Sequence, residues 1–238
     1  MPTEPSLTDP AAVIRQYAST DKLTTRRSVW GPGPEGLSPV DLLREAVLAS
    51  QPRGILEIGC GTGEFAQSVL EAAPTVAYVA TDASESMVAA ARTLGVPAQR
   101  ALAESLPFAT AAFDVVLAGW MLYHVTDLDR VLTEVRRVLR PGGTFAVATN
   151  GERHLADLLT EAGGEPLVTQ FSSENGEGTL RRHFAEVSRR DVTTWATFPD
   201  HATAAAYLAT FAPALARALP HFDGARRYEG FTTVFTCR

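Results

Sequence analysis

The chain has 238 residues, of which 45% are hydrophobic and 20% charged, and its formal net charge is −6 at pH 7. This length and balance suit one α/β domain with a covering segment and exclude a disordered or fibrous protein. The acidic charge argues against a broad phosphate-binding surface, so we expect no nucleic-acid partner. The two cysteines, Cys60 and Cys237, cannot form a disulfide framework. We expect no metal site, and we expect Cys60 to act as a small apolar residue in a turn.

The sequence gives no sign of a targeting or membrane segment. Its first residues lack a basic stretch followed by an apolar core, which a secretory leader requires. The longest apolar run, residues 113–125, is interrupted by Asp114, Gly119 and His124 and is shorter than the roughly 20 residues of a membrane span. We therefore expect a cytoplasmic protein with no membrane partner, either a monomer or a homodimer.

The first 50 residues are expected to form a helical cover. Residues 10–17 have apolar side chains at helical spacing, and residues 21–30 mix charged and apolar side chains in a pattern untypical of a sheet strand. Glycines and prolines in residues 31–36 predict a break that neither a helix nor a strand crosses. Ser38 or Asp41 then caps a helix that ends near residue 51.

Residues 55–63 predict a buried strand that enters a tight turn. Three apolar residues around Glu57 precede three glycines at alternate positions, Gly59, Gly61 and Gly63, and a helix-like sequence follows. Glycine permits positive φ and a close approach of backbone to ligand, and the start of the next helix presents free amides. A ligand is therefore expected at the carboxyl end of this strand.

A second apolar run, residues 76–82, ends in Asp82, 19 residues after Gly63 (82 minus 63). An acid at the tip of the second strand can accept hydrogen bonds from both ribose hydroxyls of an adenosine, although capping the next helix is the alternative role. The third glycine comes one residue too early for a nicotinamide fingerprint, and no Gly-Lys-Ser/Thr sequence for a nucleoside triphosphate occurs. Glu57 would repel a phosphate and suits a ligand with an ammonium and a sulfonium; capping of backbone amides is its alternative role.

Strand and helix patterns alternate up to residue 150, which implies a parallel sheet with helices on both sides. Strands are predicted at residues 54–58, 76–81, 96–101, 113–118 and 144–149, with helices starting near residues 63, 84 and 127. The pattern then loosens, with helices predicted at residues 153–161, 173–184 and 202–219 and strands at residues 187–198 and 231–237.

The segment from Glu57 to Gly63, followed by Asp82, resembles motifs I and II of the class I S-adenosylmethionine-dependent methyltransferases, in particular small-molecule enzymes of the UbiE/methyltransferase-11 type. Residues 103–108, 113–118 and 139–143 agree with the same family in order and spacing. The resemblance implies a Rossmann-like α/β fold with seven strands, mostly parallel, in the order 3-2-1-4-5-7-6, the seventh antiparallel. It divides the chain into an N-terminal helical cover (1–50) and an S-adenosylmethionine-binding methyltransferase domain (51–238).

The resemblance also implies the cofactor S-adenosyl-L-methionine, with S-adenosyl-L-homocysteine as product, and a set of cofactor-binding residues. These are Tyr17, Arg27, Glu57, Gly59, Cys60, Gly61, Gly63, Asp82, Ala83, Met87, Ala103, Glu104, Ala118 and Gly119. In the family the position of Met87 often touches the adenine as well as packing, and Glu104 would read the adenine amino group only if turned inward. A solvated acid is the alternative for Glu104, and salt bridging or core packing accounts equally well for Tyr17 and Arg27.

Methyl transfer from a sulfonium is an in-line displacement, so alignment of the acceptor and exclusion of water are the main tasks of the protein. If the acceptor must lose a proton, His124 is the candidate base, assisted by Tyr123; a hydrogen bond that holds the loop is its alternative role. The acceptor pocket is expected from Trp30, Trp120, Tyr123 and Tyr207, although core packing explains these rings equally well. Gly119 and Trp120 depart from a polar pair that many relatives carry at the same place.

These features predict a methyltransferase that acts on N or O of a small-molecule, biosynthetic acceptor. No Asp/Asn-Pro-Pro-Phe/Tyr sequence occurs, which argues against methylation of exocyclic base amines. A C-methyltransferase, another enzyme that uses S-adenosylmethionine, and a cofactor-binding regulator without turnover are the alternatives.

Overall fold

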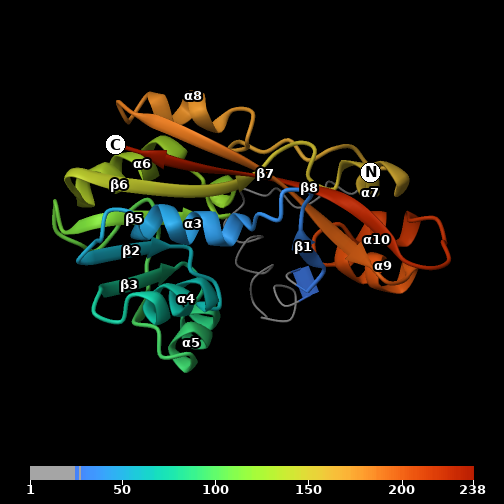
Figure 1. The fold of residues 1–238 in the computed structure, drawn as a ribbon, viewed down its shortest axis with the longest axis horizontal. Coiled ribbons are helices and arrows are strands. Elements are labelled where there is room, and N and C mark those ends of the chain that lie inside the picture. Colours follow the sequence, from blue (N-terminus) through green and yellow to red (C-terminus); the bar gives the residue numbers. More distant parts are fainter. Residues whose placement is uncertain (1–24, 27) are drawn as a thin grey trace.

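A computed structural model describes residues 25–26 and 28–238, which form an eight-stranded sheet flanked by helices (Figure 1). The strands are β1 (Trp30–Pro32), β2 (Gly54–Ile58), β3 (Ala77–Asp82), β4 (Ala98–Arg100), β5 (Phe113–Gly119), β6 (Leu139–Asn150), β7 (Val187–Phe198) and β8 (Arg226–Cys237). Their order is β1-β7-β8-β6-β5-β2-β3-β4. Strands β2 to β6 are parallel, and β8 is antiparallel to both of its neighbours. Apart from β1, this is the expected order with an antiparallel last strand, so that prediction is confirmed.

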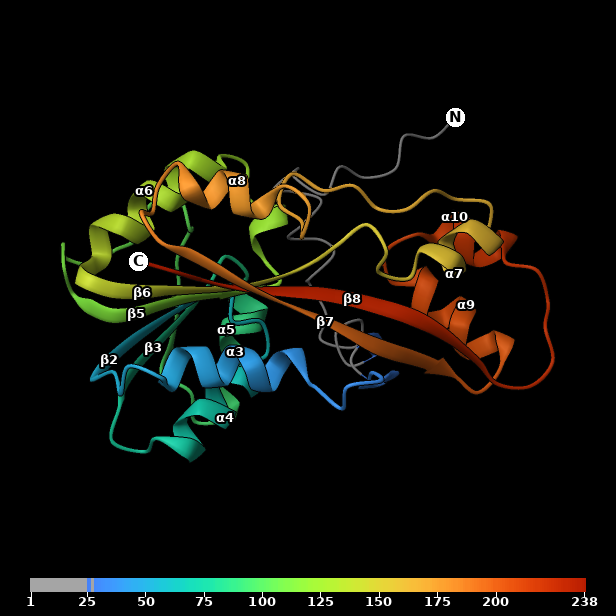
Figure 2. The same cartoon turned by 45° about the horizontal axis from the view of Figure 1, so that its top comes forward.

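The helices cover both faces of this sheet, as Figure 2 shows. They are α3 (Pro39–Leu48), α4 (Glu64–Ala72), α5 (Glu85–Thr93), α6 (Leu128–Val138), α7 (Ala156–Glu161), α8 (Gly176–Arg181), α9 (His201–Ala209) and α10 (Pro213–Ala218), with a 3-10 turn η1 (Leu122–His124). Residues of α3, α4 and α5 pack on one face, and residues of α6 and α8 on the other. Burial on both faces explains why the central strand β5 is a nearly continuous apolar run.

Several helices begin where the sequence places a capping residue. Ser38 caps α3 and accepts a hydrogen bond from the backbone N–H of Asp41, so the first of the two predicted caps is the one used. Asp127 caps α6 in the same way. A side-chain oxygen at this position satisfies one of the backbone donors that a helix start leaves unpaired. Helix α3 buries Leu42, Leu43 and Val47 against the sheet; the domain division at residue 50 stays a prediction.

The two C-terminal strands are as long as β6, at 12 residues each, and their far ends carry a further apolar core. Strands β7 and β8 pair along all 12 residues, whereas β6 pairs with β8 only as far as Thr232. The ends of β7 and β8 beyond this point, together with β1, α7, α9 and α10, are here called the distal lobe (Figure 1). Its core contains Val29, Leu155, Leu158, Leu159, Ala162, Ala196, Phe198, Ala204, Tyr207, Leu208, Leu219, Phe222 and Tyr228.

Strand β1 corrects the predictions that a helical segment continues to residue 30 and that residues 31–36 form a break. Trp30 to Pro32 pair antiparallel with residues 194–196 of β7. Proline is tolerated here because an edge strand needs ladder hydrogen bonds on one side only. Gly33 comes so close to β7 that a Cβ atom would lie 1.8 Å from the carbonyl oxygen of Thr193. The open edge of β7, which lies far away in sequence, therefore overrides the local pattern.

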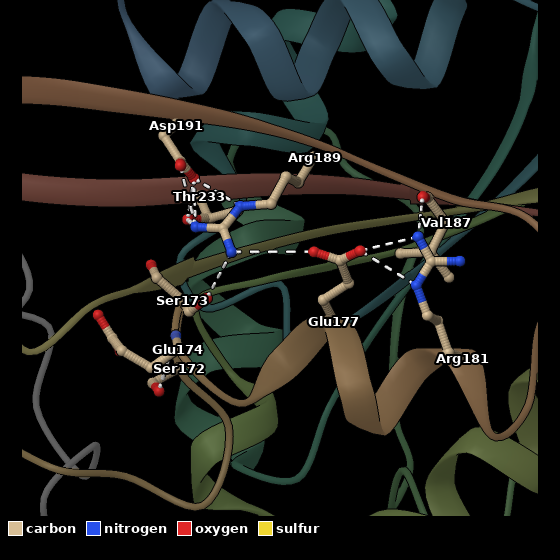
Figure 3. Close-up of polar contacts among 9 residues, drawn as sticks. All are labelled: Ser172, Ser173, Glu174, Glu177, Arg181, Val187, Arg189, Asp191 and Thr233. Atoms are coloured by element: carbon tan, nitrogen blue, oxygen red, sulfur yellow. Dashed lines mark hydrogen bonds and ion pairs between the residues drawn. The ribbon is translucent and has the colours of Figure 1, made fainter.

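A polar network joins the segment before α8 to β7 (Figure 3). The guanidinium of Arg189 on β7 contacts both carboxylate oxygens of Asp191 at 2.8 and 2.9 Å, and it donates to the carbonyl of Ser173 at 3.0 Å. Glu177 of α8 lies 3.9 Å from the same guanidinium. Exposed ion pairs add little to stability, so their main effect is to fix geometry. Because the N–H of Ser173 donates to the carbonyl of Asn150, the network also holds the carboxyl end of β6.

Candidate functional site

The glycine turn after β2 has the backbone that the sequence predicts. Gly59, Gly61 and Gly63 have φ angles of 71°, 55° and 89°, a region that disfavours residues with a Cβ. The N–H groups of Gly59 and Cys60 donate to the carbonyl of Thr81, at 2.8 and 2.9 Å, and so tie the turn to the end of β3. Gly63 is the N-terminal cap of α4. The turn therefore lies at the carboxyl edge of the sheet, as expected.

Two of the three glycines make room for the protein itself. A Cβ at Gly63 would lie 2.8 Å from the Cβ and 3.0 Å from the Cα of Ala91, so this glycine permits the close approach of α5. A Cβ at Gly59 would lie 2.7 Å from the Cγ of Met121. The sequence predicted close approach of a ligand, and the structure adds close approach of two side chains of the chain.

Asp82, at the end of β3, is held beside the glycine turn. Its Oδ2 accepts from the N–H of Gly61 at 2.9 Å, and its Oδ1 accepts from the N–H of Ser84 at 2.8 Å. Ser84 caps α5, accepting from the N–H of Met87, so the alternative role of Asp82 as the helix cap is wrong. Burial raises the pKa of the Asp82 carboxyl, and the hydrogen bonds from the backbone oppose this shift. Each carboxylate oxygen can still accept a further hydrogen bond.

Glu57 is 3% exposed and lies on the same face of the sheet as Tyr78 of the neighbouring strand. The hydroxyl of Tyr78 donates to Oε2 of Glu57 at 2.8 Å, a partner other than the backbone amides suggested by the sequence. Burial and the neighbouring Glu57 carboxylate raise the pKa of Tyr78 well above its usual range. Burial, followed by the charges of Glu57 and Asp82, raises the pKa of the Cys60 thiol, so that Cys60 is a buried neutral residue as predicted.

The three residues expected near the adenine have different surroundings. Met87 and Ala103 are 1% and 7% exposed and lie in the interior. Glu104 accepts a hydrogen bond from the N–H of Thr126 at 3.1 Å, and its carbonyl accepts from the guanidinium of Arg130 at 2.8 Å. The carboxylate of Glu104 therefore holds the loop that leads to α6, a role that the sequence did not suggest.

The chain leaves β5 through a strained residue. Ala118 is fully buried, and after Gly119 the backbone of Trp120 adopts a φ of 54°, which is unusual for a bulky residue. The N–H of Trp120 donates to the carbonyl of Ala148, and its indole N–H donates to Oδ1 of Asn150 at 3.0 Å. Asn150 is a site residue that the sequence reasoning missed. A polar residue directly after a buried strand, as at Asp82, was the available signal.

The turn η1 places the two candidate proton-transfer residues at the same edge. Tyr123 and His124 are half-buried, with their ring centroids 4.4 Å apart in an edge-to-face arrangement. The N–H of His124 donates to the carbonyl of Met121 at 2.9 Å, which closes the turn.

The other two expected acceptor residues belong to the distal lobe. Trp30 stacks on the ring of His154, with centroids 4.7 Å apart. Tyr207 is 4% exposed and packs edge-to-face against Phe198 and Phe211, so its surroundings are those of a core residue. Burial raises the pKa of Tyr207 to about 12, which keeps its hydroxyl protonated. Tyr17 and Arg27 lie outside the described residues.

The structure thus brings together Glu57, residues 59–63, Asp82, residues 118–124 and Asn150 at one edge of the sheet, here called the crest. Residues 56–147, which contain most of it, match the family model described as "Methyltransferase domain". This segment is a methyltransferase domain.

Curated relatives of the methyltransferase domain include two biosynthetic enzymes. The malonyl-[acyl-carrier protein] O-methyltransferase of Methylococcus capsulatus is 35% identical over 116 residues, which are 47% of this chain and 42% of that protein. The ubiquinone/menaquinone biosynthesis C-methyltransferase UbiE of Ralstonia pickettii is 41% identical over 100 residues, 39% of this chain and 41% of that protein. The chain thus spans about two fifths of the length of these relatives.

Solved structures share the Rossmann-like fold of the methyltransferase domain over more of the chain. A putative methyltransferase of Bacillus halodurans has a TM-score of 0.63 at 16% identity and covers 85% of this chain and 99% of its own. The cyclase SpnF has a TM-score of 0.63 at 20% identity, and the match covers 99% of this chain and 97% of that chain. Identities this low establish the fold alone.

No cluster of three or more potential metal-ligating side chains occurs within residues 25–26 and 28–238. In this same part of the chain, no helix has both the length and the apolar character to cross a membrane.

Proposed function

We propose that this chain is an S-adenosylmethionine-dependent methyltransferase that transfers the methyl group to N or O of a small biosynthetic acceptor. The observation that carries the proposal is the contact between Asp82 and Gly61, which sets a carboxylate beside a glycine turn at the carboxyl edge of a parallel sheet. This edge, outside the strand ends, is where open α/β sheets bind their ligands.

The charges of the crest fit this cofactor. Its residues carry the carboxylates of Glu57 and Asp82 and no lysine or arginine. Such a set disfavours a pyrophosphate and suits a ligand with an ammonium and a sulfonium. S-adenosylmethionine supplies a methyl group on a positively charged sulfur. Asp82 would bind the ribose hydroxyls with the acceptor capacity that its two backbone hydrogen bonds leave, and Glu57 would favour the positive charge.

The residues that follow β5 form the acceptor side of the proposal. His124 would take a proton from an acceptor that must lose one, and Tyr123 packs against its ring. Alignment of acceptor and methyl group provides most of the catalysis, since positioning alone can lower a barrier by roughly 7 to 11 kcal/mol. Gly119 and Trp120 give this side a small residue and a large ring.

The relatives support two choices of acceptor atom. One is named as an O-methyltransferase, which supports the oxygen acceptor. The other is named as a C-methyltransferase, and this favours methylation of carbon as the second candidate. Turnover itself must be measured, because SpnF, which shares the fold, is described as a cyclase.

The test has a binding arm and a transfer arm. Calorimetric titration with S-adenosylhomocysteine should give saturable binding, and tritiated methyl groups should pass from the cofactor to a small molecule in a pooled metabolite extract. Asp82→Asn should weaken binding, whereas Asp223→Asn, at a fully exposed side chain of the distal lobe, should not. Absence of binding would refute the proposal, and binding without transfer to any compound would favour the cofactor-binding regulator.

A further inference from the structure

The carboxyl end of β6 carries an amide whose orientation is fixed by its neighbours. The indole N–H of Trp120 can only donate, and it lies 3.0 Å from Oδ1 of Asn150, which identifies that atom as the oxygen. The hydroxyl of Thr232 lies 3.0 Å from the same Oδ1. Both donors bind one end of the amide, so its NH₂ group is directed away from them.

The NH₂ group of Asn150 has no acceptor among residues 25–26 and 28–238, whereas the side-chain oxygen and the backbone carbonyl of this residue are both engaged. The carbonyl accepts from the N–H of Ser173 at 3.2 Å, and Asn150 lies opposite Thr232 in the register of β6 and β8. Among the described residues, the buried side-chain atoms without a hydrogen-bond partner are Ser173 Oγ and Glu229 Oε1, so the NH₂ group is open to solvent and a ligand oxygen can replace water there. The strained backbone of Trp120, which brings the indole to Oδ1, is a cost of this arrangement.

Two indole rings lie on the same face of the sheet as this amide. The indole of Trp120 donates to Asn150, and the ring of Trp30 lies over Gly230 of β8. A Cβ at Gly230 would be only 2.2 Å from the Trp30 ring. Gly230 and Thr232 are two residues apart on one strand and therefore on the same face, about 7 Å from each other. The fixed donor thus lies on the face of the sheet that also carries the two indole rings.

We propose that Asn150 is an acceptor-binding residue of this methyltransferase. Its NH₂ group donates to an oxygen, in a carboxylate, carbonyl or phenolate, of a flat acceptor on the face of the sheet that carries Trp120 and Trp30. This inference rests on the proposed function for the acceptor's role, but the binding site itself does not require turnover. A donor of this kind holds the oxygen next to the methylated atom and favours the anionic form of the acceptor.

The first test uses the fact that the chain has only two asparagines, Asn150 and Asn175. Protein labelled with ¹⁵N-asparagine should give two pairs of side-chain amide peaks in a proton–nitrogen spectrum, one pair for the NH₂ signal of each asparagine. The NH₂ of Asn175 donates to the carbonyl of Thr169 at 2.9 Å, which makes it an internal control. Benzoate, a flat carboxylate, should shift the Asn150 signal alone, and benzylamine, its cationic counterpart, should shift neither signal.

The second test removes the NH₂ donor of Asn150 and keeps the oxygen that accepts from Trp120 and Thr232. Asn150→Asp retains an oxygen for Trp120 and Thr232 but replaces the NH₂ group by an anionic oxygen, so benzoate affinity should fall about tenfold or more. S-adenosylhomocysteine affinity and the unfolding midpoint should be unchanged. Gln99→Glu, the same change on the edge strand β4, should leave benzoate binding as in the wild type.

The outcomes separate the two proposals. Failure of benzoate to bind the wild type, a shift of both asparagine signals, or equal benzoate affinity in Asn150→Asp would each overturn the assignment of Asn150. A wild type that binds benzoate through Asn150 but does not bind S-adenosylhomocysteine would instead refute the proposed function.

Discussion

Alanine substitution of three left-handed glycines should separate backbone strain from steric crowding. Gly95, Gly59 and Gly63 have φ angles of 78°, 71° and 89°. A Cβ at Gly95 meets nothing within 4 Å, one at Gly59 meets the flexible side chain of Met121, and one at Gly63 meets the Cα of Ala91 at 3.0 Å. The three sites therefore share the strain and differ in what the added methyl group touches.

The expected losses in the free energy of unfolding follow from these contacts. Left-handed backbone costs a residue with a Cβ roughly 1 to 2 kcal/mol, and the restricted unfolded chain returns about 0.4 to 1 kcal/mol. Gly95→Ala should therefore lose about 1 kcal/mol. Overpacking costs typically about 1 to 3 kcal/mol, so Gly63→Ala, against the backbone of α5, should lose about 2 to 4 kcal/mol in total. Gly59→Ala should fall between them, because Met121 can move.

Urea unfolding followed by circular dichroism measures these losses, provided that the dependence on denaturant is the same in each variant. The double variant Gly59→Ala/Met121→Ala should be less destabilised than the sum of its single variants, because the clash is present in Gly59→Ala and is relieved when Met121 is shortened. Equal losses for Gly95→Ala and Gly63→Ala would refute the role of Gly63 in helix packing. Strict additivity of the double variant would do the same for the contact of Gly59 with Met121.

Three further predictions concern titration, reactivity and binding. Asp82→Asn should weaken S-adenosylhomocysteine binding about ten- to hundredfold by calorimetry, since hydrogen bonds to a charged group contribute about 1.5 to 3 kcal/mol each; an unchanged affinity would contradict our assignment. Burial lowers the pKa of His154 from 6.5 to about 4. As the pH drops through this interval, the histidine takes up a proton in the unfolded chain but not in the folded one, so the free energy of unfolding should fall by about 2 to 3 kcal/mol. His154→Gln should remove this slope in unfolding curves. The buried thiols of Cys60 and Cys237, whose pKa values are raised by burial, should react with a thiol reagent only after unfolding.

The sequence by itself predicted the elements that a local pattern of apolar residues and local backbone preferences determine. The bounds of β2 and β7 match the predicted strands 54–58 and 187–198, because both strand patterns are bounded by residues that do not continue them. The glycines of the turn have positive φ as expected. The order of the sheet came from the resemblance of the motifs and not from spacing.

Contacts between distant segments were not predictable in this way. The residues of β1 resemble a loop and became a strand only because the edge of β7 was available. The predicted helix 173–184 is shorter in the structure, where α8 covers only Gly176–Arg181. Glu104 looks like a surface acid until the loop before α6 is placed beside it.

Asn150 shows most clearly which features the sequence determines and which the tertiary structure decides. Its position after a strand is visible in the sequence, but its fixed amide depends on Trp120 and Thr232, which lie 30 and 82 residues away along the chain. Local sequence determines which residues are buried and which backbone angles they adopt, because these depend on neighbours in the chain. Contacts between distant side chains depend on sheet register and strand order, and only the tertiary structure decides these two features.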